Sequence, residues 1–261
     1  MIQKSLLGLL IAASCVPAMA ADWSTTELQY QIGNLKQQPF GPDADDKSTT
    51  SIYTLQHASG WKYGDNFFFI DYSDWKDDQR RRDWYGEGYF NFSLGKISGR
   101  DLSLGPVKDI GLVMGVNAGG DSKVRKYLPG VQLALDVPGA AFFNTLITAY
   151  IDDSTGVAGG GAPKESNSWM LDTAWAFPFS AGSHDFSLEG HLEYIGSREN
   201  EFGDKVKAHV LAQPQLRYDL GKTLFNDPQR LFVGIEYQYW HNKYGSSVTE
   251  SAVQGLAVWR F

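Results

Sequence analysis

Apolar and polar residues alternate in many segments of the chain, each about ten residues long. In one such segment the apolar residues take one parity and the polar residues the other: Phe186, Leu188, Leu192 and Tyr194 against Ser187, Glu189, His191 and Glu193. A side-chain period of two is typical of a β-strand with one apolar and one polar face. Residues 206–220 and 231–240 repeat the pattern, so it is a property of the whole chain.

About twelve segments of this kind can be counted. They lie near residues 23–32, 49–58, 66–75, 86–95, 107–118, 127–137, 141–152, 168–179, 184–196, 206–220, 230–241 and 248–261. After the first twenty residues, the longest apolar stretches, such as Ile110 to Val116, are far shorter than the roughly 20 residues of a membrane-spanning helix. If the chain crosses a membrane, strands must do so.

The connections between the segments mostly alternate between long and short. Long polar loops such as 33–48 and 153–167 follow the first, third, seventh and ninth segments, whereas tight turns such as 138–139 and 181–182 follow the second, sixth and eighth. Only the turns at 96–105 and 221–229 are longer than this scheme prefers. The pattern predicts an all-β fold, a transmembrane antiparallel β-barrel of about 12 strands with minimal helix.

The two ends of the chain indicate export. Lys4, the apolar run Leu6 to Val16 and the small residues around Met19 predict a signal peptide over 1–20, which leaves 21–261 as the barrel. Lipid attachment at Cys15, the only cysteine, is the alternative. At the other end the last segment closes on Phe261, which resembles the terminal aromatic signal by which outer-membrane barrels are recognised for assembly.

Composition narrows the function classes. Aromatic residues make up 14% of the chain and there are 28 glycines, a mixture that favours strands and turns over helices or disorder. The formal net charge is -7, which argues against a nucleic-acid partner. Without cysteine the mature chain has no disulfide framework, so a large core or a membrane must stabilise it.

Several motifs resemble one family. Phe92-Ser93-Leu94, followed by Asp101-Leu102-Ser103-Leu104-Gly105-Pro106, resembles a region of the Tsx nucleoside channels. Residues 60–65, 67–71 and 239–241 resemble the same superfamily, including its OmpK branch, and the likeness runs along nearly all of the mature chain. The resemblance implies a monomeric twelve-stranded barrel in the bacterial outer membrane, with a narrow pore that passes nucleosides along aromatic residues.

The third segment carries the best candidate site. Phe68, Ile70 and Tyr72 form its apolar parity, which directs Phe67, Phe69 and Asp71 toward the interior of the barrel. Two phenyl rings beside a carboxylate suit a nucleobase and a ribose, and the competing explanation is packing of a narrow interior. The other expected pore-lining residues are Glu87, Tyr89, Glu189, His191, Glu193, His209, Arg217, Glu236 and Trp240, the last as a possible opposing ring.

The inward parity also predicts an ion preference. Its acids are Asp71, Glu87, Asp172, Glu189, Glu193 and Glu236, and its bases are Lys207, Arg217 and Arg260. Rings of acidic side chains favour cations, so we expect a weakly cation-selective pore.

Two constellations suggest other chemistry. His57 and Ser59 share a strand face, as in outer-membrane phospholipases, but they lie at the wrong end of the barrel for an enzyme of the outer leaflet. His209, Glu193 and His191 have ligand types that suit zinc, although hydrogen-bonded pairs are the simpler explanation, and no metal site is predicted.

The sequence therefore predicts an outer-membrane channel for passive diffusion of nucleosides or similar small polar solutes, without a cofactor. Its remaining partners are outer-membrane lipid and, through residues 80–82, either lipopolysaccharide phosphate or solvent alone. The rival functions are a lipid-degrading barrel enzyme using His57 and Ser59, and a soluble periplasmic β-protein whose apolar faces meet another sheet.

Overall fold

The structure is a computed structural model that describes residues 21–37, 46–76 and 81–261. The predicted signal peptide and Cys15 lie outside the described residues. The long strands are β1 (Trp23–Lys36), β2 (Lys47–Trp61), β3 (Gly64–Trp75), β4 (Arg82–Ser93), β5 (Val107–Gly119), β6 (Arg125–Leu135), β7 (Phe142–Asp152), β8 (Ser168–Ala181), β9 (His184–Ile195), β14 (Leu231–His241) and β15 (Glu250–Arg260). These bounds agree with the expected segments to within a few residues.

One further position in the sheet is shared by two short strands. β12 (His209–Ala212) and β13 (Gln215–Asp219) both pair with β9 and β14, and Gln213 and Pro214 interrupt them. Proline has no amide hydrogen to donate to a ladder, which explains a break within the predicted single strand 206–220. The described residues therefore form twelve strand positions.

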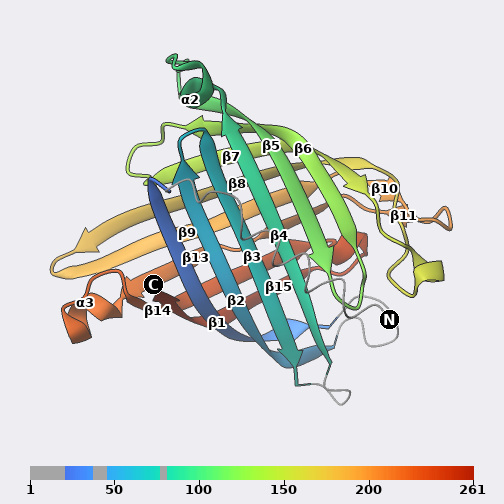
Figure 1. The fold of residues 1–261 in the computed structure, drawn as a ribbon. Coiled ribbons are helices and arrows are strands. Elements are labelled where there is room, and N and C mark those ends of the chain that lie inside the picture. Colours follow the sequence, from blue (N-terminus) through green and yellow to red (C-terminus); the bar gives the residue numbers. More distant parts are fainter. Residues whose placement is uncertain (1–20, 38–45, 77–80) are drawn as a thin grey trace, which may run out of the picture.

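The sheet closes on itself. Each strand pairs antiparallel with its neighbours in the chain, and β1 pairs with β15 from Glu27 opposite Arg260 to Gly33 opposite Gln254. Figure 1 shows the result, a ring of strands tilted in a common direction. The predicted closed twelve-strand antiparallel barrel is confirmed.

The connections fall into two groups at opposite ends of the barrel. The end that holds the start of β1 and the end of β15, which we call the terminal end, also carries the helices α2 (Leu94–Ser98) and α3 (Leu220–Phe225) (Figure 1). The opposite end, the loop end, carries the hairpin of β10 (Arg198–Glu199) and β11 (Lys205–Val206) and the 3-10 turns η2 (Val157–Gly159) and η3 (Lys243–Gly245). Both helices sit in the turns that were longer than expected. None of the helices in the described part of the chain is long and apolar enough to cross a membrane.

The two faces of the barrel are opposite in character. Along β3, Phe68, Ile70 and Tyr72 are exposed on the outer face, and they alternate with partly buried residues on the inner face. Across the described residues the buried set holds 28 polar or charged residues but only 13 hydrophobic ones. A soluble protein has the reverse arrangement. Among the described residues the apolar outer faces meet no second large sheet, so the alternative of a soluble sandwich is wrong.

Part of the interior is nevertheless apolar. A cluster on the inner faces of β4 to β9 consists of Tyr89, Val113, Leu128, Leu146, Tyr150, Met170 and Ile195, and Phe67 packs against it. This cluster narrows one side of the interior.

Near the terminal end, charged residues bind strands that are distant in the sequence. Arg217 Nη1 lies 3.1 Å from Glu27 Oε2 and 3.0 Å from Glu189 Oε2, and Arg260 Nη2 lies 2.6 Å from Glu27 Oε1. Glu27 and Arg217 are each only 2% exposed. The four residues, which we call the closing network, join the first strand to the last and to β9 and β13.

Removing Glu27 should weaken the closed barrel. Glu27→Ala leaves Arg217 and Arg260 buried or half-buried without their shared partner, a loss of about 3–5 kcal/mol for a broken buried pair. We expect unboiled protein to convert to its slow-migrating unfolded form on denaturing gels at a clearly lower temperature. Asp227→Ala, which removes a largely exposed pair with Arg230, is the control and should change little. Equal conversion temperatures for wild type and Glu27→Ala would contradict this role.

Candidate functional site

The expected site on β3 lies on the inner face of the barrel. The ring centroids of Phe67 and Phe69 are 6.2 Å apart, and Phe69 lies 6.2 Å from the ring of Tyr85 on β4. Thr54 Oγ1 donates a 2.5 Å hydrogen bond to Asp71 Oδ1. Phe67 also packs against the apolar cluster, whereas Phe69 does not. Phe69 is therefore the ring whose face is more available to a solute.

Glu87 on β4 lies beside this strand and is held by three donors. Tyr85 donates to Glu87 Oε1 at 2.6 Å, Tyr89 donates to Oε2 at 2.7 Å, and Asn117 Nδ2 donates to Oε1 at 2.9 Å. Tyr85 and Asn117 were absent from the expected site residues. For Tyr85 a signal existed, because it shares the parity of Glu87 and Tyr89.

A second group of polar residues extends along β9 and the strands beside it. His191 Nδ1 lies 3.3 Å from Asp172 Oδ1, and His191 Nε2 lies 2.9 Å from Gln213 Oε1. Gln213 Nε2 in turn donates to Glu236 Oε1 at 3.3 Å. This chain of contacts crosses the inner face from β8 to β14.

The carboxylates of these two groups influence each other across the interior. The charge of Glu87 interacts with those of Asp172 and His191, and the charge of Glu193 interacts with those of Glu87 and Asp172. Asp71 interacts with Glu87 and Glu236. We call Asp71, Glu87, Asp172, Glu193 and His191 the acidic belt; they lie on the inner faces of β3, β4, β8 and β9.

Most other expected site residues have structural partners. Glu189 and Arg217 belong to the closing network. Gln215 and Gln254 donate to the buried carboxylate of Glu236 at 2.6 and 2.7 Å. Glu189, Arg217 and Glu236 are therefore on the inner face, where they hold neighbouring strands together.

Trp240 and His209 lie together toward the loop end. The Trp240 ring is 4.3 Å from that of Tyr244 and 6.3 Å from that of His209, and Lys243 Nζ lies 5.5 Å above Trp240. Trp240 thus faces the interior but is part of an aromatic stack rather than a free opposing ring.

Two expectations from strand register need correction. Lys207 is not on the inner face of a strand; it lies between β11 and β12 and donates to Ser247 at 2.8 Å. His209 pairs with Ile195, two residues from Glu193, because the hairpin register is shifted from the one assumed. Among the described residues no group of three His, Cys, Asp or Glu side chains could hold a metal ion.

His57 and Ser59 do meet, on the outer face near the terminal end. Thr26 Oγ1 lies 2.8 Å from His57 Nδ1, and His57 Nε2 lies 3.2 Å from Ser59 Oγ. The Ser59 hydroxyl, however, donates to Asn66 Oδ1 at 2.9 Å, so its proton is not directed at the imidazole. A nucleophile needs a base that accepts its proton, and here Asn66 Oδ1 is the closer acceptor for the Ser59 hydroxyl.

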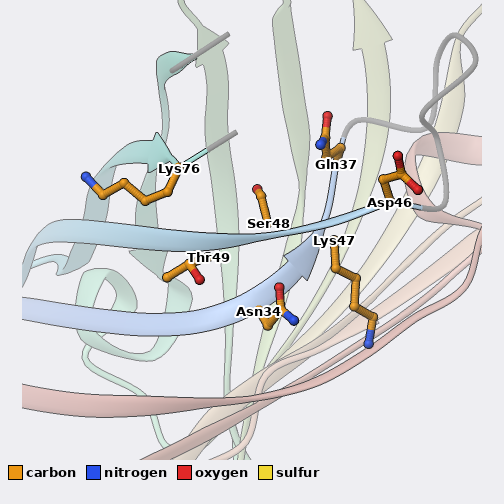
Figure 2. Close-up of a pocket in the computed structure, with 7 residues that line it drawn as sticks. All are labelled: Asn34, Gln37, Asp46, Lys47, Ser48, Thr49 and Lys76. Atoms are coloured by element: carbon orange, nitrogen blue, oxygen red, sulfur yellow. The ribbon is translucent and has the colours of Figure 1, made fainter. Parts of the chain in front are cut away.

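The segment around Arg81 and the pocket beside it give no convergent site. Arg80 lies outside the described residues, Arg81 donates to Gln37, and Arg82 Nε lies 3.5 Å from Asp74 Oδ1. Figure 2 shows the neighbouring pocket, whose lining side chains point in different directions. They are Asn34, Gln37, Asp46, Lys47, Ser48, Thr49 and Lys76.

The loop end is closed in part by ion pairs. Lys126 Nζ lies 2.9 Å from Asp152 Oδ2 and 2.8 Å from Glu165 Oε2, which also receives Arg198 Nε at 2.7 Å. Burial opposes ionisation of Glu165, but Arg198 and Lys126 outweigh it and hold the pKa of this carboxyl below its usual value. The loop between β7 and β8 is thereby fixed to β6 and to the β10–β11 hairpin.

Glu201 fastens the outer part of the same loop. Its Oε1 accepts from the backbone amides of Val157 at 2.8 Å and Lys164 at 3.1 Å. Lys123 Nζ adds a 2.8 Å bond to the carbonyl of Gly159. Three connections at the loop end are thus joined into one layer.

Removing the Glu201 carboxylate should loosen this layer. Glu201→Ala leaves two backbone amides without their acceptor, so we expect trypsin to cleave after Lys164 roughly tenfold faster, since each bond to a charged group contributes about 1.5–3 kcal/mol. Mass spectrometry of the fragments measures the rate. Glu199→Ala is the matched control, because in the described structure its backbone, and not its side chain, makes the hydrogen bonds to Ser166. Equal rates for the two variants would show that Glu201 does not hold the loop.

Comparisons with known proteins agree with this architecture. No family model matches the chain. It is 25% identical over 264 residues to the outer membrane protein OmpK of Vibrio parahaemolyticus, across 93% of this chain and 91% of the relative. The NanC porin structure has a TM-score of 0.51 and 14% identity, covering 89% of this chain and 98% of the porin. An outer membrane channel from Pseudomonas putida F1 has a TM-score of 0.51 and 8% identity, covering 94% and 99%.

Together with the closed barrel and its apolar outer face, these similarities define the class of protein. The chain is a porin-like β-barrel of the outer membrane. The expected likeness to OmpK is confirmed as a distant similarity, whereas membership of the nucleoside channels in that superfamily stays a prediction.

Proposed function

We propose that this barrel is a passive channel for nucleosides or similar small polar solutes. The observation that carries the proposal is the inner face itself, where polar and charged residues predominate although the outer face is apolar. A polar interior enclosed by an apolar wall is the arrangement by which β-barrels pass water-soluble molecules through a bilayer. The similarity to an outer membrane protein and the porin-like fold support the same function.

Nucleosides are the proposed solutes because of the β3 site and its neighbours. The Phe69 and Tyr85 rings offer faces for stacking a base, and Asp71 offers an acceptor for sugar hydroxyls. Asp71 and Glu87 lie on adjacent strands, so one solute can contact both the rings and the carboxylates. The binding must be loose enough for release at the far side.

The remaining parts of the proposal concern setting and partners. The terminal end faces the periplasm and the loop end faces the cell exterior, the usual orientation when short turns and both termini share a side. The chain acts as a monomer, uses no cofactor and catalyses no reaction. Outer-membrane lipid contacts the apolar face, and Arg82, the exposed one of the two described arginines of the cluster, is placed to meet lipopolysaccharide phosphate.

Conductance is the direct test of a channel. Purified protein in planar bilayers should give discrete conductance steps with a weak cation preference, because the carboxylates of the acidic belt outnumber its basic groups. The preference should shrink as salt rises, since ions screen fixed charges. Reversal potentials across a potassium chloride gradient measure it. A barrel that inserts without conducting, or that selects anions at low salt, would count against the proposal.

The nucleoside site makes a sharper prediction. Phe69→Ala removes a stacking face that contributes about 1–3 kcal/mol, so uptake of adenosine into liposomes at low concentration should fall roughly tenfold. Glucose uptake should change little, because a hexose stacks poorly on a phenyl ring. Phe90→Ala, which removes a ring from the lipid-facing side of β4, is the matched control. A proportional loss of both solutes would mean that Phe69 only shapes the interior.

A further inference from the structure

Glu193 is the least satisfied carboxylate of the acidic belt. Its side chain is 8% exposed and lies on the inner face of β9, yet within the described structure it receives no hydrogen bond and forms no ion pair. Carboxylate oxygens that receive no donor from the protein are open to hydrogen bonds from water or a solute. Asp71, Glu87 and Asp172 in the same belt each receive at least one donor. Glu193 therefore has unused acceptor capacity directed into the interior.

Asn117 provides an independent sign of a missing donor. It is 1% exposed, and its Nδ2 donates to Glu87 in the belt, but its Oδ1 has no partner among the described residues. Buried amide oxygens are nearly always hydrogen-bonded in folded proteins. Asn117 Oδ1 can therefore accept a hydrogen bond from a solute that binds beside these carboxylates.

The missing donor is not a metal ion. The carboxylates of Glu87 on one wall and of Asp172 and Glu193 on the other interact electrostatically, but no three acidic or histidine ligands in the described chain are close enough to coordinate one cation. A larger cation with several N–H donors can instead bind separate carboxylates through charge-assisted hydrogen bonds. Within the belt the imidazole of His191 is the one basic group beside four carboxylates, and the charge of Arg198 acts on Glu193 from beyond ion-pair distance.

Aromatic rings alternate with the belt carboxylates. In the β3–β4 register Phe69 lies opposite Glu87 and Asp71 lies opposite Tyr85. The face of an aromatic ring attracts an ammonium group within about 6 Å of its centroid. Carboxylates interleaved with rings are a suitable environment for an organic ammonium ion and a poor one for an anion.

We propose that the acidic belt is a binding subsite for small organic cations that carry primary ammonium groups, with Glu193 and Asn117 Oδ1 as acceptors for the ammonium hydrogens. The inference names a second solute class for the proposed channel and rests on that function only for passage of the bound cation. The ammonium supplies the donors that Glu193 and Asn117 lack and offsets the charge shared by the four carboxylates. Phe69 and Tyr85 contact the adjoining methylene groups.

Titration calorimetry of the detergent-solubilised barrel with 1,4-diaminobutane tests the proposal. We expect saturable binding to the wild type and none of the neutral isostere 1,4-butanediol. Glu193→Gln should weaken diamine binding about tenfold, which corresponds to about 1.4 kcal/mol. Asp65→Asn is the matched control: it neutralises an inner-face acid that accepts from Asn91 outside the belt, and it should bind as the wild type does.

The outcomes separate the two proposals. Equal diamine affinity in wild type and Glu193→Gln, or equal affinity of the wild type for the diol, would overturn the inference. The diol comparison uses wild-type protein alone, so it holds even if the variant does not fold. Calorimetry in detergent needs no conduction: diamine binding by a non-conducting barrel would uphold the subsite and refute the channel, whereas a conducting barrel without diamine binding would do the reverse.

Discussion

The pairing of β1 with β15 is the constraint on which the rest of the structure depends. In a bilayer every backbone donor and acceptor must be satisfied within the protein, and an open sheet leaves two unpaired edges. Closure of the sheet removes both edges, and it also encloses the barrel interior. Glu27 and Arg260 become neighbours only when the ring is complete, although 233 positions separate them in the chain. The polar parity of each strand is buried for the same reason.

The sequence was sufficient for the strands and their faces because both are local properties. A period of two identifies a strand and tells which residues share a side, so the inward direction of Phe69, Glu87 and Glu193 followed from their neighbours alone. Even the breaks had local signals: Pro214 divides one strand, and the two long turns accommodate the short helices at the terminal end.

What meets across the interior could not be predicted in this way. Contacts between walls depend on the tilt and stagger of the closed sheet, which no single segment encodes. The bond from Gln215 to Gln29 joins β13 to β1 past the two strands between them. The offset of His209 from Glu193 reflects a hairpin register that loop length alone does not determine. The closing network was likewise invisible, because Glu27 lies in a segment whose partner is the far end of the chain.

Charge is distributed unevenly along the barrel, and this distribution links stability to function. Near the terminal end the closing network pairs Glu27 and Glu189 with two arginines, and at the loop end Lys126 and Arg198 are paired with acids. Between them the acidic belt has four carboxylates and a single histidine. Ion pairs at both ends fix the strands that hold the belt, so the charges in the middle need not contribute to folding. A barrel held in this way can keep unsatisfied acceptors in its interior, where a passing solute, rather than the protein itself, supplies the donors.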